Sequence, residues 1–280
     1  MKTVENFQSA TKPAAASGSR IAVSGPQVFN VPIAGGTAPR NATRTAQKLA
    51  TFALEHVSDI RCGPGRHRYL DVGCGNGFIT EYVAVDFDEV VGIDMERERL
   101  EDFRAHAKWK PTYRVLEMSA ASIEFPDNFF SFITAFEVLE HVADLEKSAD
   151  EMVRACRPGG VLAVSVPQRW FPIENHGVRL GNTEYERKVP LLPYIRPLHR
   201  KYALARVFSS TEMDDLFLSR GMLHLATGYA SPQFERAGAN EHSWESRLIF
   251  LRSVLERCET IPFLRALTGV SMLKAYRKAF

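Results

Sequence analysis

Three glycines alternate with other residues in the segment Asp71-Val72-Gly73-Cys74-Gly75-Asn76-Gly77, which directly follows a short apolar run. Glycine has no Cβ, so such a loop lets backbone amides come close to a ligand. The spacing is Gly-x-Gly-x-Gly, whereas dinucleotide-binding loops have Gly-x-Gly-x-x-Gly. A second apolar run, Val90 to Ile93, ends in Asp94, and a carboxylate there could accept hydrogen bonds from both hydroxyls of a ribose. The alternative is that Asp94 only caps the following helix, but the loop and the acid together favour a nucleoside ligand.

Four further side chains are candidate bases or substrate contacts. Glu137 and His141 lie one helical turn apart, so both can face the same side, and Glu174 and His176 lie in a later loop that begins with Trp-Phe. Histidine suits the role of general base at neutral pH. The alternatives are that His141, with Glu140, only forms a local turn, and that Glu174 and His176 are ordinary surface-loop residues.

The sequence predicts no metal site. Glu174 with His176 alone supplies too few ligands for a divalent cation. No cysteine pair has the Cys-x-x-Cys spacing that zinc sites use.

Apolar runs alternate with amphipathic stretches between residues 68 and 167. Strands are predicted at 69–72, 90–94, 113–116, 130–135 and 161–166, and helices at 78–85, 96–109 and 144–156. Arg157-Pro158-Gly159-Gly160 predicts a turn before the fifth strand. This alternation indicates an α/β fold, a doubly wound and mostly parallel sheet with right-handed crossovers, in which ligands bind outside the carboxyl ends of the strands.

The flanking segments have a different character. Residues 1–40 are rich in Gly, Pro, Ser and Ala and predict a flexible tail or flap, and residues 41–280 are expected to form one domain. After Pro167 the alternation lapses, so residues 168–207 are predicted to be a substrate lid inserted after the fifth strand. Further elements are expected in the flanks: a helix from Asn41, a helix capped by Ser210-Thr211 that closes at Gly221, a strand from Met222 to Thr227, a helix from Glu245 to Arg257 and a final edge strand from Ser271 to Tyr276.

Composition excludes several classes of protein. The chain has 280 residues, of which 45% are hydrophobic, and a formal net charge of +2. A packed core is therefore expected, and a global attraction to nucleic acid is not. The scattered cysteines fit a reduced, cytoplasmic protein better than a disulfide scaffold. No apolar run approaches the roughly 20 residues of a membrane span.

The motifs as a set resemble those of class I S-adenosylmethionine (SAM)-dependent methyltransferases, in particular the branch similar to ubiquinone and menaquinone biosynthesis enzymes. The resemblance covers about residues 65–167 and rests on the glycine segment, Val91-Gly92-Ile93-Asp94, Phe136-Glu137-Val138-Leu139-Glu140-His141-Val142 and Arg157-Pro158-Gly159-Gly160. It implies SAM as the cofactor and a Rossmann-like fold.

The resemblance also implies roles for single residues. Gly73, Cys74 and Gly75 would line the methionine part of SAM, and Asp71 would orient the loop and approach the SAM amino group. Asp94 would hold the ribose, Met95 would lie against the adenine, and Phe136 would lie beside the cofactor. Relatives often carry an Asp that contacts the adenine amino group; here the matching position is Ser119, followed by Ala120, so Ser119 or a backbone amide would make that contact.

The segment 168–207 is locally basic and aromatic. Such a mixture fits an anionic or partly apolar small molecule, and we expect methyl transfer to an oxygen of such an acceptor. The same mixture could bind RNA, which leaves a nucleic-acid methyltransferase as one alternative and a non-catalytic SAM-binding protein as another. A nicotinamide dehydrogenase is disfavoured by the glycine spacing. No feature predicts an oligomeric state.

Overall fold

The computed structural model describes residues 32–33, 36–37, 49–56, 65–84, 87–106, 112–185, 188–230 and 269–280. The helix expected from Glu245 to Arg257 and most of the expected tail at 1–40 lie outside these residues. Within the tail, β1 (Pro32–Ile33) pairs antiparallel with β2 (Gly36–Thr37). Of the helix expected from Asn41, residues 49–55 are described and are helical.

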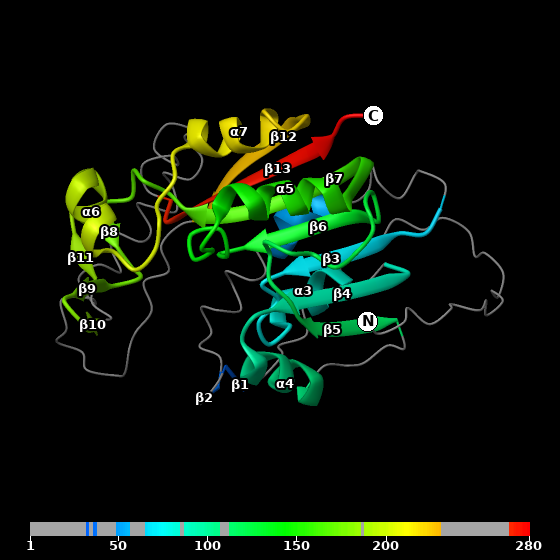
Figure 1. Ribbon diagram of the computed structural model, residues 1–280, viewed down its shortest axis with the longest axis horizontal. Coiled ribbons are helices and arrows are strands. Elements are labelled where there is room, and N and C mark those ends of the chain that lie inside the picture. Colours follow the sequence, from blue (N-terminus) through cyan, green and yellow to red (C-terminus); the bar gives the residue numbers. More distant parts are fainter. Residues whose placement is uncertain are drawn as a thin grey trace.

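A seven-stranded sheet forms the centre of the structure, with strand order β12-β13-β7-β6-β3-β4-β5 (Figure 1). Neighbours within β7-β6-β3-β4-β5 are parallel, whereas β13 runs antiparallel to both β7 and β12. The prediction of a doubly wound, mostly parallel sheet is confirmed. The strands are β3 (Arg68–Val72), β4 (Glu89–Asp94), β5 (Tyr113–Glu117), β6 (Phe130–Phe136), β7 (Cys156–Pro167), β12 (Met222–Ala230) and β13 (Ser271–Lys278).

Both faces of the sheet are covered, because successive side chains of a strand point to opposite faces. Leu70 and Val72 of β3 pack with α5 (Leu145–Ala155) and α7 (Ser210–Leu218). Tyr69 points the other way and packs with residues 49–53 and α3 (Phe78–Val83). A smaller cluster joins α4 (Arg97–His106) to the glycine loop.

Helix α7 begins one residue earlier than Ser210-Thr211 suggested. Its N-cap is Ser209, whose side chain accepts a hydrogen bond from the Glu212 amide, and the Glu212 side chain accepts one from the Ser209 amide. This reciprocal pair is a capping box, which satisfies two amides that the first turn leaves free. The helix ends near Gly221, as expected, where φ is 78°.

The structure corrects two predicted elements. Ser271–Tyr276 is not an edge strand: β13 lies between β7 and β12, and β12 forms the edge. Arg157-Pro158-Gly159-Gly160 is not a separate turn but the irregular start of β7, where the register against β6 shifts between Phe130 and Phe132. Gly159 takes up the extra length with a φ of 72°.

The segment after β7 folds into short elements beyond the carboxyl ends of the parallel strands, at the left of Figure 1. They are β8 (Ile173–Glu174), β9 (Val178–Leu180), β10 (Thr183–Tyr185), β11 (Val189–Pro190), a 3-10 turn (Leu192–Tyr194) and α6 (Arg196–Tyr202). In the described part of the chain, no helix combines the length and apolar character that a bilayer crossing requires.

Candidate functional site

The glycine loop and Asp94 meet at the carboxyl edge of the sheet, next to the point where strand order reverses at β3. The Gly75 amide donates to Asp94 Oδ2 at 2.9 Å, and the Glu96 amide donates to Oδ1 at 2.9 Å. Gly73, Gly75 and Gly77 have φ angles of 71°, 52° and 79°, which side chains with a Cβ rarely adopt. Asp94 is half-buried, and a carboxylate has about four acceptor positions, so it can accept further hydrogen bonds from a ligand.

Asp71 lies beneath this loop and is buried. Its Oδ1 accepts from Thr134 Oγ1 at 2.7 Å and its Oδ2 from Thr80 Oγ1 at 2.5 Å. Burial raises the pKa of Asp71 to about 6, against the lowering effect of hydrogen bonds from Thr80, Thr134 and Tyr69. These contacts tie β3, β6 and α3 together beneath the loop, and the orienting role expected of Asp71 stays a prediction.

The other predicted cofactor residues surround the same crevice to different extents. The Cys74 side chain is buried in a cluster with Leu100, Phe103 and Val115, so only its backbone is left to face a ligand. Met95 is 64% exposed directly after β4. The remaining predicted residues follow β5 or end β6 and are half-buried or buried: Ser119, Ala120 and Phe136. Their assignments to cofactor contacts stay predictions.

The loop after β6 packs directly on the glycine loop. A Cβ on Gly73 would lie 2.2 Å from Val138 Cγ2, so the two loops touch there. Glu137 has a φ of 55°, an uncommon conformation for a residue with a side chain. Its amide donates to the Ser165 carbonyl oxygen at 3.0 Å, and its Oε1 accepts from Ser165 Oγ at 2.7 Å. Burial raises the pKa of Glu137, and this carboxyl is held against β7.

Glu140 has a buried carboxyl group close to two imidazoles. Its Oε1 lies 3.8 Å from His141 Nε2 and 4.0 Å from His176 Nε2. Burial, and then the charge of Glu137, raise the pKa of Glu140 to about 9. Both effects favour the protonated form of this carboxyl group.

Glu174 anchors the imidazole of His176. Its Oε1 accepts from the His176 amide at 2.8 Å and lies 3.3 Å from His176 Nδ1, and its Oε2 lies 2.5 Å from His199 Nε2. Burial acts to raise the pKa of Glu174, but hydrogen bonds from His176 and His199 outweigh it and lower the pKa to about 2. A carboxylate at Nδ1 favours a proton on that nitrogen and leaves the Nε2 lone pair of His176 free to accept one.

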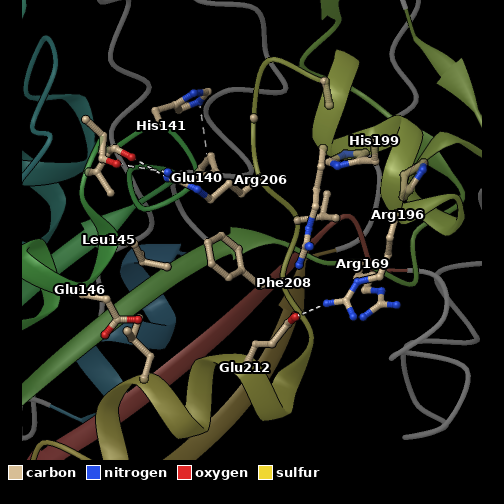
Figure 2. Close-up of a pocket in the computed structure, with 18 of the residues that line it drawn as sticks. Glu140, His141, Leu145, Glu146, Arg169, Arg196, His199, Arg206, Phe208 and Glu212 are labelled. Carbon is tan, nitrogen blue, oxygen red and sulfur yellow. Dashed lines mark hydrogen bonds and ion pairs between the residues drawn. The ribbon is translucent and has the colours of Figure 1, made fainter.

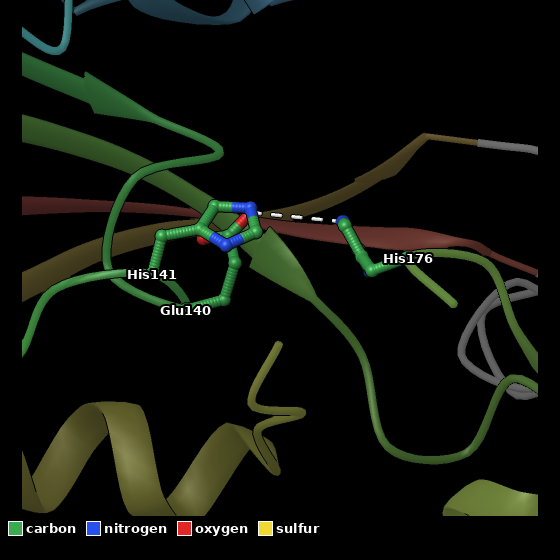
Figure 3. Close-up of side chains that lie close together, drawn as sticks. All are labelled: Glu140, His141 and His176. Atoms are coloured by element: carbon green, nitrogen blue, oxygen red, sulfur yellow. Dashed lines mark ion pairs between the residues drawn. The ribbon is translucent and has the colours of Figure 1, made fainter. Parts of the chain in front are cut away.

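The structure thus brings the four predicted catalytic candidates to one edge of the sheet. The rings of His141 and His176 lie 5.4 Å apart, centre to centre, at 73°, and Figure 3 shows both beside Glu140. Burial, and then the nearby His176, lower the pKa of His141. The lowered pKa of His141 favours its neutral form. A neutral imidazole can receive a proton from a substrate.

The same group bears on the predicted absence of a metal site, which stays a prediction. One ligand atom each from Glu140, His141 and His176 lie within 4.8 Å of one another, so ligands other than Glu174 are available. Two imidazoles and a carboxylate match the protein ligands of catalytic zinc sites. The sequence pointed to His141 and His176 separately, but nothing in it linked the loop after β6 to the loop after β7. His199, which completes the contacts of Glu174, was missed because no local motif marks it.

A cleft of about 870 Å³ opens beside Glu140 and His141, between α6 and α7 (Figure 2). Its walls carry both apolar side chains and arginines. Sites for small molecules are commonly clefts of about 300–1,000 Å³ with this mixed character.

Part of this chain is similar in sequence to methyltransferases. Residues 70–164 match the family model described as a methyltransferase domain. The ubiquinone biosynthesis O-methyltransferase of Alkalilimnicola ehrlichii is 30% identical over 134 residues, 47% of this chain and 54% of that protein. The enzyme of the same name from Vibrio cholerae (strain O395) is 35% identical over 125 residues, 44% of this chain and 51% of that protein. This chain thus spans about half the length of the curated relatives it matches.

A solved structure shows the same fold at low sequence identity. The crystal structure of the N-methyltransferase NodS from Bradyrhizobium japonicum has a TM-score of 0.52 at 14% identity, covering 84% of this chain and 96% of that chain. One fold hosts many chemistries, so this likeness describes the architecture alone.

Proposed function

Because the chain carries a class I SAM-dependent methyltransferase domain, we propose that it transfers a methyl group from SAM to an oxygen of a small molecule, with His176 as the general base. The observation that carries this proposal is the position of the Glu174–His176 pair. The pair lies at the carboxyl edge of the sheet, where the glycine loop and Asp94 also lie.

The residues at this edge fit SAM. Gly75 and Asp94 are joined by a hydrogen bond, so the loop for the methionine part and the acid for the ribose lie side by side. A Cβ on Gly75 would meet nothing nearer than Arg99 at 3.8 Å, which leaves the backbone there open to a ligand. Asp94 would hold the ribose hydroxyls, and the backbone of Gly73 and Gly75 would line the methionine part.

The chain supplies alignment and a base. When bound, SAM offers a methyl group on a positively charged sulfur, which is already activated for transfer. Holding the reacting atoms in line can lower a barrier by about 7–11 kcal/mol in favourable cases. The acceptor hydroxyl gives its proton to Nε2 of His176 as its oxygen bonds to the methyl carbon and the carbon–sulfur bond breaks. Glu174 steadies the imidazolium that results, because its carboxylate stays ionised.

Two further observations support an oxygen acceptor on a small molecule. Relatives at 30–35% identity are named as O-methyltransferases of ubiquinone biosynthesis, and the cleft beside His141 has the size of a small-molecule site. A cytoplasmic location is part of the proposal and is supported by the buried free thiols of Cys74 and Cys156.

A turnover assay tests the base. The full chain is incubated with SAM and a panel of phenols, carboxylic acids and amines, and release of S-adenosylhomocysteine is measured. His176→Ala is expected to slow transfer to hydroxyl acceptors by about 10²–10⁴-fold without changing the affinity for S-adenosylhomocysteine. His224→Ala, an exposed histidine on β12, is the matched control. Turnover with amines only, or an unchanged rate in His176→Ala, contradicts the proposal.

A further inference from the structure

The cleft between α6 and α7 carries an uneven distribution of charge. Arginines come from four places around it: Arg169 after β7, Arg196 and Arg200 on α6, Arg206 after α6 and Arg220 after α7. The carboxyl groups in its lining are Glu140, Glu146, Glu212 and Asp215. Of these, Glu140 is buried, and the other three are half-buried or exposed.

Several of these arginines already have partners. Arg220 pairs with Glu146 at 2.6 Å and with Asp150 at 2.7 Å. Arg196 pairs with Glu212 Oε1 at 2.5 Å. The Arg206 guanidinium donates to the Val142 and Ala143 carbonyl oxygens. These three arginines form part of the walls of the cleft, and a ligand could bind them only by breaking the contacts just described.

Arg169 and Arg200 are different. Within the part of the chain that the structure describes, neither guanidinium has a carboxylate at ion-pair distance; that of Arg169 lies over the Trp170 ring at 5.6 Å. Figure 2 shows Arg169 and Arg196 on the same side of the cleft as Glu212. The second oxygen of Glu212 is already used by the Ser209 amide, so this one carboxylate does not neutralise the arginines around it.

The rest of the cleft lining is apolar or lies near His141. Leu145, Phe208 and Leu216 line the wall formed by α5 and α7, and Glu140 and His141 lie at one end. A molecule that fills the cleft would therefore meet cationic groups on the α6 side, an apolar middle and, at the end, His141, whose ring lies 5.4 Å from that of His176.

We propose that this cleft is the acceptor site and that it recognises an amphiphilic oxyanion, a phosphate monoester with an apolar body, through Arg169 and Arg200. Guanidinium groups bind phosphate oxygens in a bidentate fashion. The apolar body lies along Leu145 and Phe208, which directs the reacting hydroxyl toward His141 and His176. This assignment rests on the methyltransferase function proposed above and names its acceptor class.

Calorimetry on the full chain tests the site with defined probes: octyl phosphate, inorganic phosphate and the uncharged octyl glucoside. Octyl phosphate is expected to bind more tightly than either of the others. Combined Arg169→Gln and Arg200→Gln substitutions should weaken its binding about tenfold or more, the scale of losing charge-assisted hydrogen bonds. Arg179→Gln is the matched control, because Arg179 is an exposed arginine on β9 paired with Glu184 and absent from the cleft lining.

Three outcomes overturn the proposal: no binding of octyl phosphate, equal affinity for octyl phosphate and octyl glucoside, or equal losses in the double variant and in Arg179→Gln. Equal affinity for inorganic phosphate and octyl phosphate overturns the apolar half of the site. S-adenosylhomocysteine is titrated into the same samples. Its failure to bind the unaltered chain removes the methyltransferase function, whereas intact cofactor binding without octyl phosphate binding removes only the acceptor site. A thermal midpoint equal to that of the unaltered chain shows that the double variant is folded.

Discussion

Replacement of Asp94 by Ala tests the cofactor site most directly. The Asp94 carboxylate accepts the Gly75 and Glu96 amides, each at 2.9 Å, which uses about two of its four acceptor positions. The remaining two can accept the ribose hydroxyls. Hydrogen bonds to a charged group contribute about 1.5–3 kcal/mol. We therefore expect the dissociation constant of S-adenosylhomocysteine to rise about 10- to 150-fold, measured by calorimetry. Asp94→Asn keeps one acceptor oxygen and should lose less.

Asp88 provides a matched control, because it directly precedes β4 while Asp94 ends it. Asp88 is exposed and its Oδ2 also accepts a backbone amide, that of His67, at 2.9 Å. Asp88→Ala should therefore leave cofactor affinity unchanged. The ribose assignment is refuted by an unchanged affinity in Asp94→Ala, or by equal losses in both variants, which would indicate a general effect on the sheet. The thermal midpoint of each variant separates weaker binding from unfolding.

Three other perturbations give further predictions. Gly73→Ala places a Cβ 2.2 Å from Val138 Cγ2 at a φ of 71°, so we expect a loss of stability of about 1–3 kcal/mol in urea denaturation and loss of cofactor binding. Gly181→Ala, at a φ of 63° with nothing near it, should cost less, and equal costs would contradict the packing argument. Glu174→Gln removes a carboxylate whose pKa is about 2 rather than 4.5. A lowered pKa stabilises the fold above pH 4.5, and this stabilisation is lost as the pH falls toward 2. The variant should therefore be less stable at pH 7 by at most about 3 kcal/mol, and its stability should lack that dependence on acid pH. Zinc ions should inhibit methyl transfer by occupying the basic nitrogens of His141 and His176. Activation by zinc, or loss of activity with a chelator, would indicate a catalytic metal in place of a general base.

The parallel part of the sheet could be predicted because its signals are local. Each strand from β3 to β7 contains a short apolar run, β3, β4 and β6 are followed by helices, and the glycine loop and Asp94 mark two adjacent strand ends. Chain order and right-handed crossovers then bring those ends together. The cofactor half of the candidate site follows from these local features alone.

The position of β13 could not be predicted in the same way. Lys274 within Ser271–Tyr276 suggests an exposed edge, because lysine is rarely buried without a partner. In the structure Lys274 is 1% exposed, and its Nζ donates to Asp214 Oδ2 at 2.8 Å and to Ser210 Oγ at 2.7 Å. The partner comes from α7, about 60 residues earlier, so the charge that makes burial acceptable is invisible in the local sequence.

The part of the candidate site around His176 also depends on contacts between residues that are far apart in the sequence. His176 approaches Glu140 because the chain after β7 folds back over the loop after β6, and Arg206 helps to fix that arrangement by donating to the Val142 carbonyl oxygen. His199 reaches Glu174 from α6. These contacts depend on the conformation of a segment without regular periodicity, which the sequence pattern does not determine.

Two buried glutamates near His176 have pKa values that are shifted in opposite directions. Glu174 is fixed as a carboxylate by hydrogen bonds from two histidines, and its low pKa makes it a poor proton acceptor. Burial, and then the charge of Glu137, raise the pKa of Glu140 to about 9, which favours its protonated form. The imidazole of His176 lies beside both acids, with Nδ1 3.3 Å from Glu174 Oε1 and Nε2 4.0 Å from Glu140 Oε1. Environments that push the pKa values of neighbouring groups apart separate the roles of acid and base, which supports the proposal that the imidazole of His176 takes the proton of the acceptor hydroxyl.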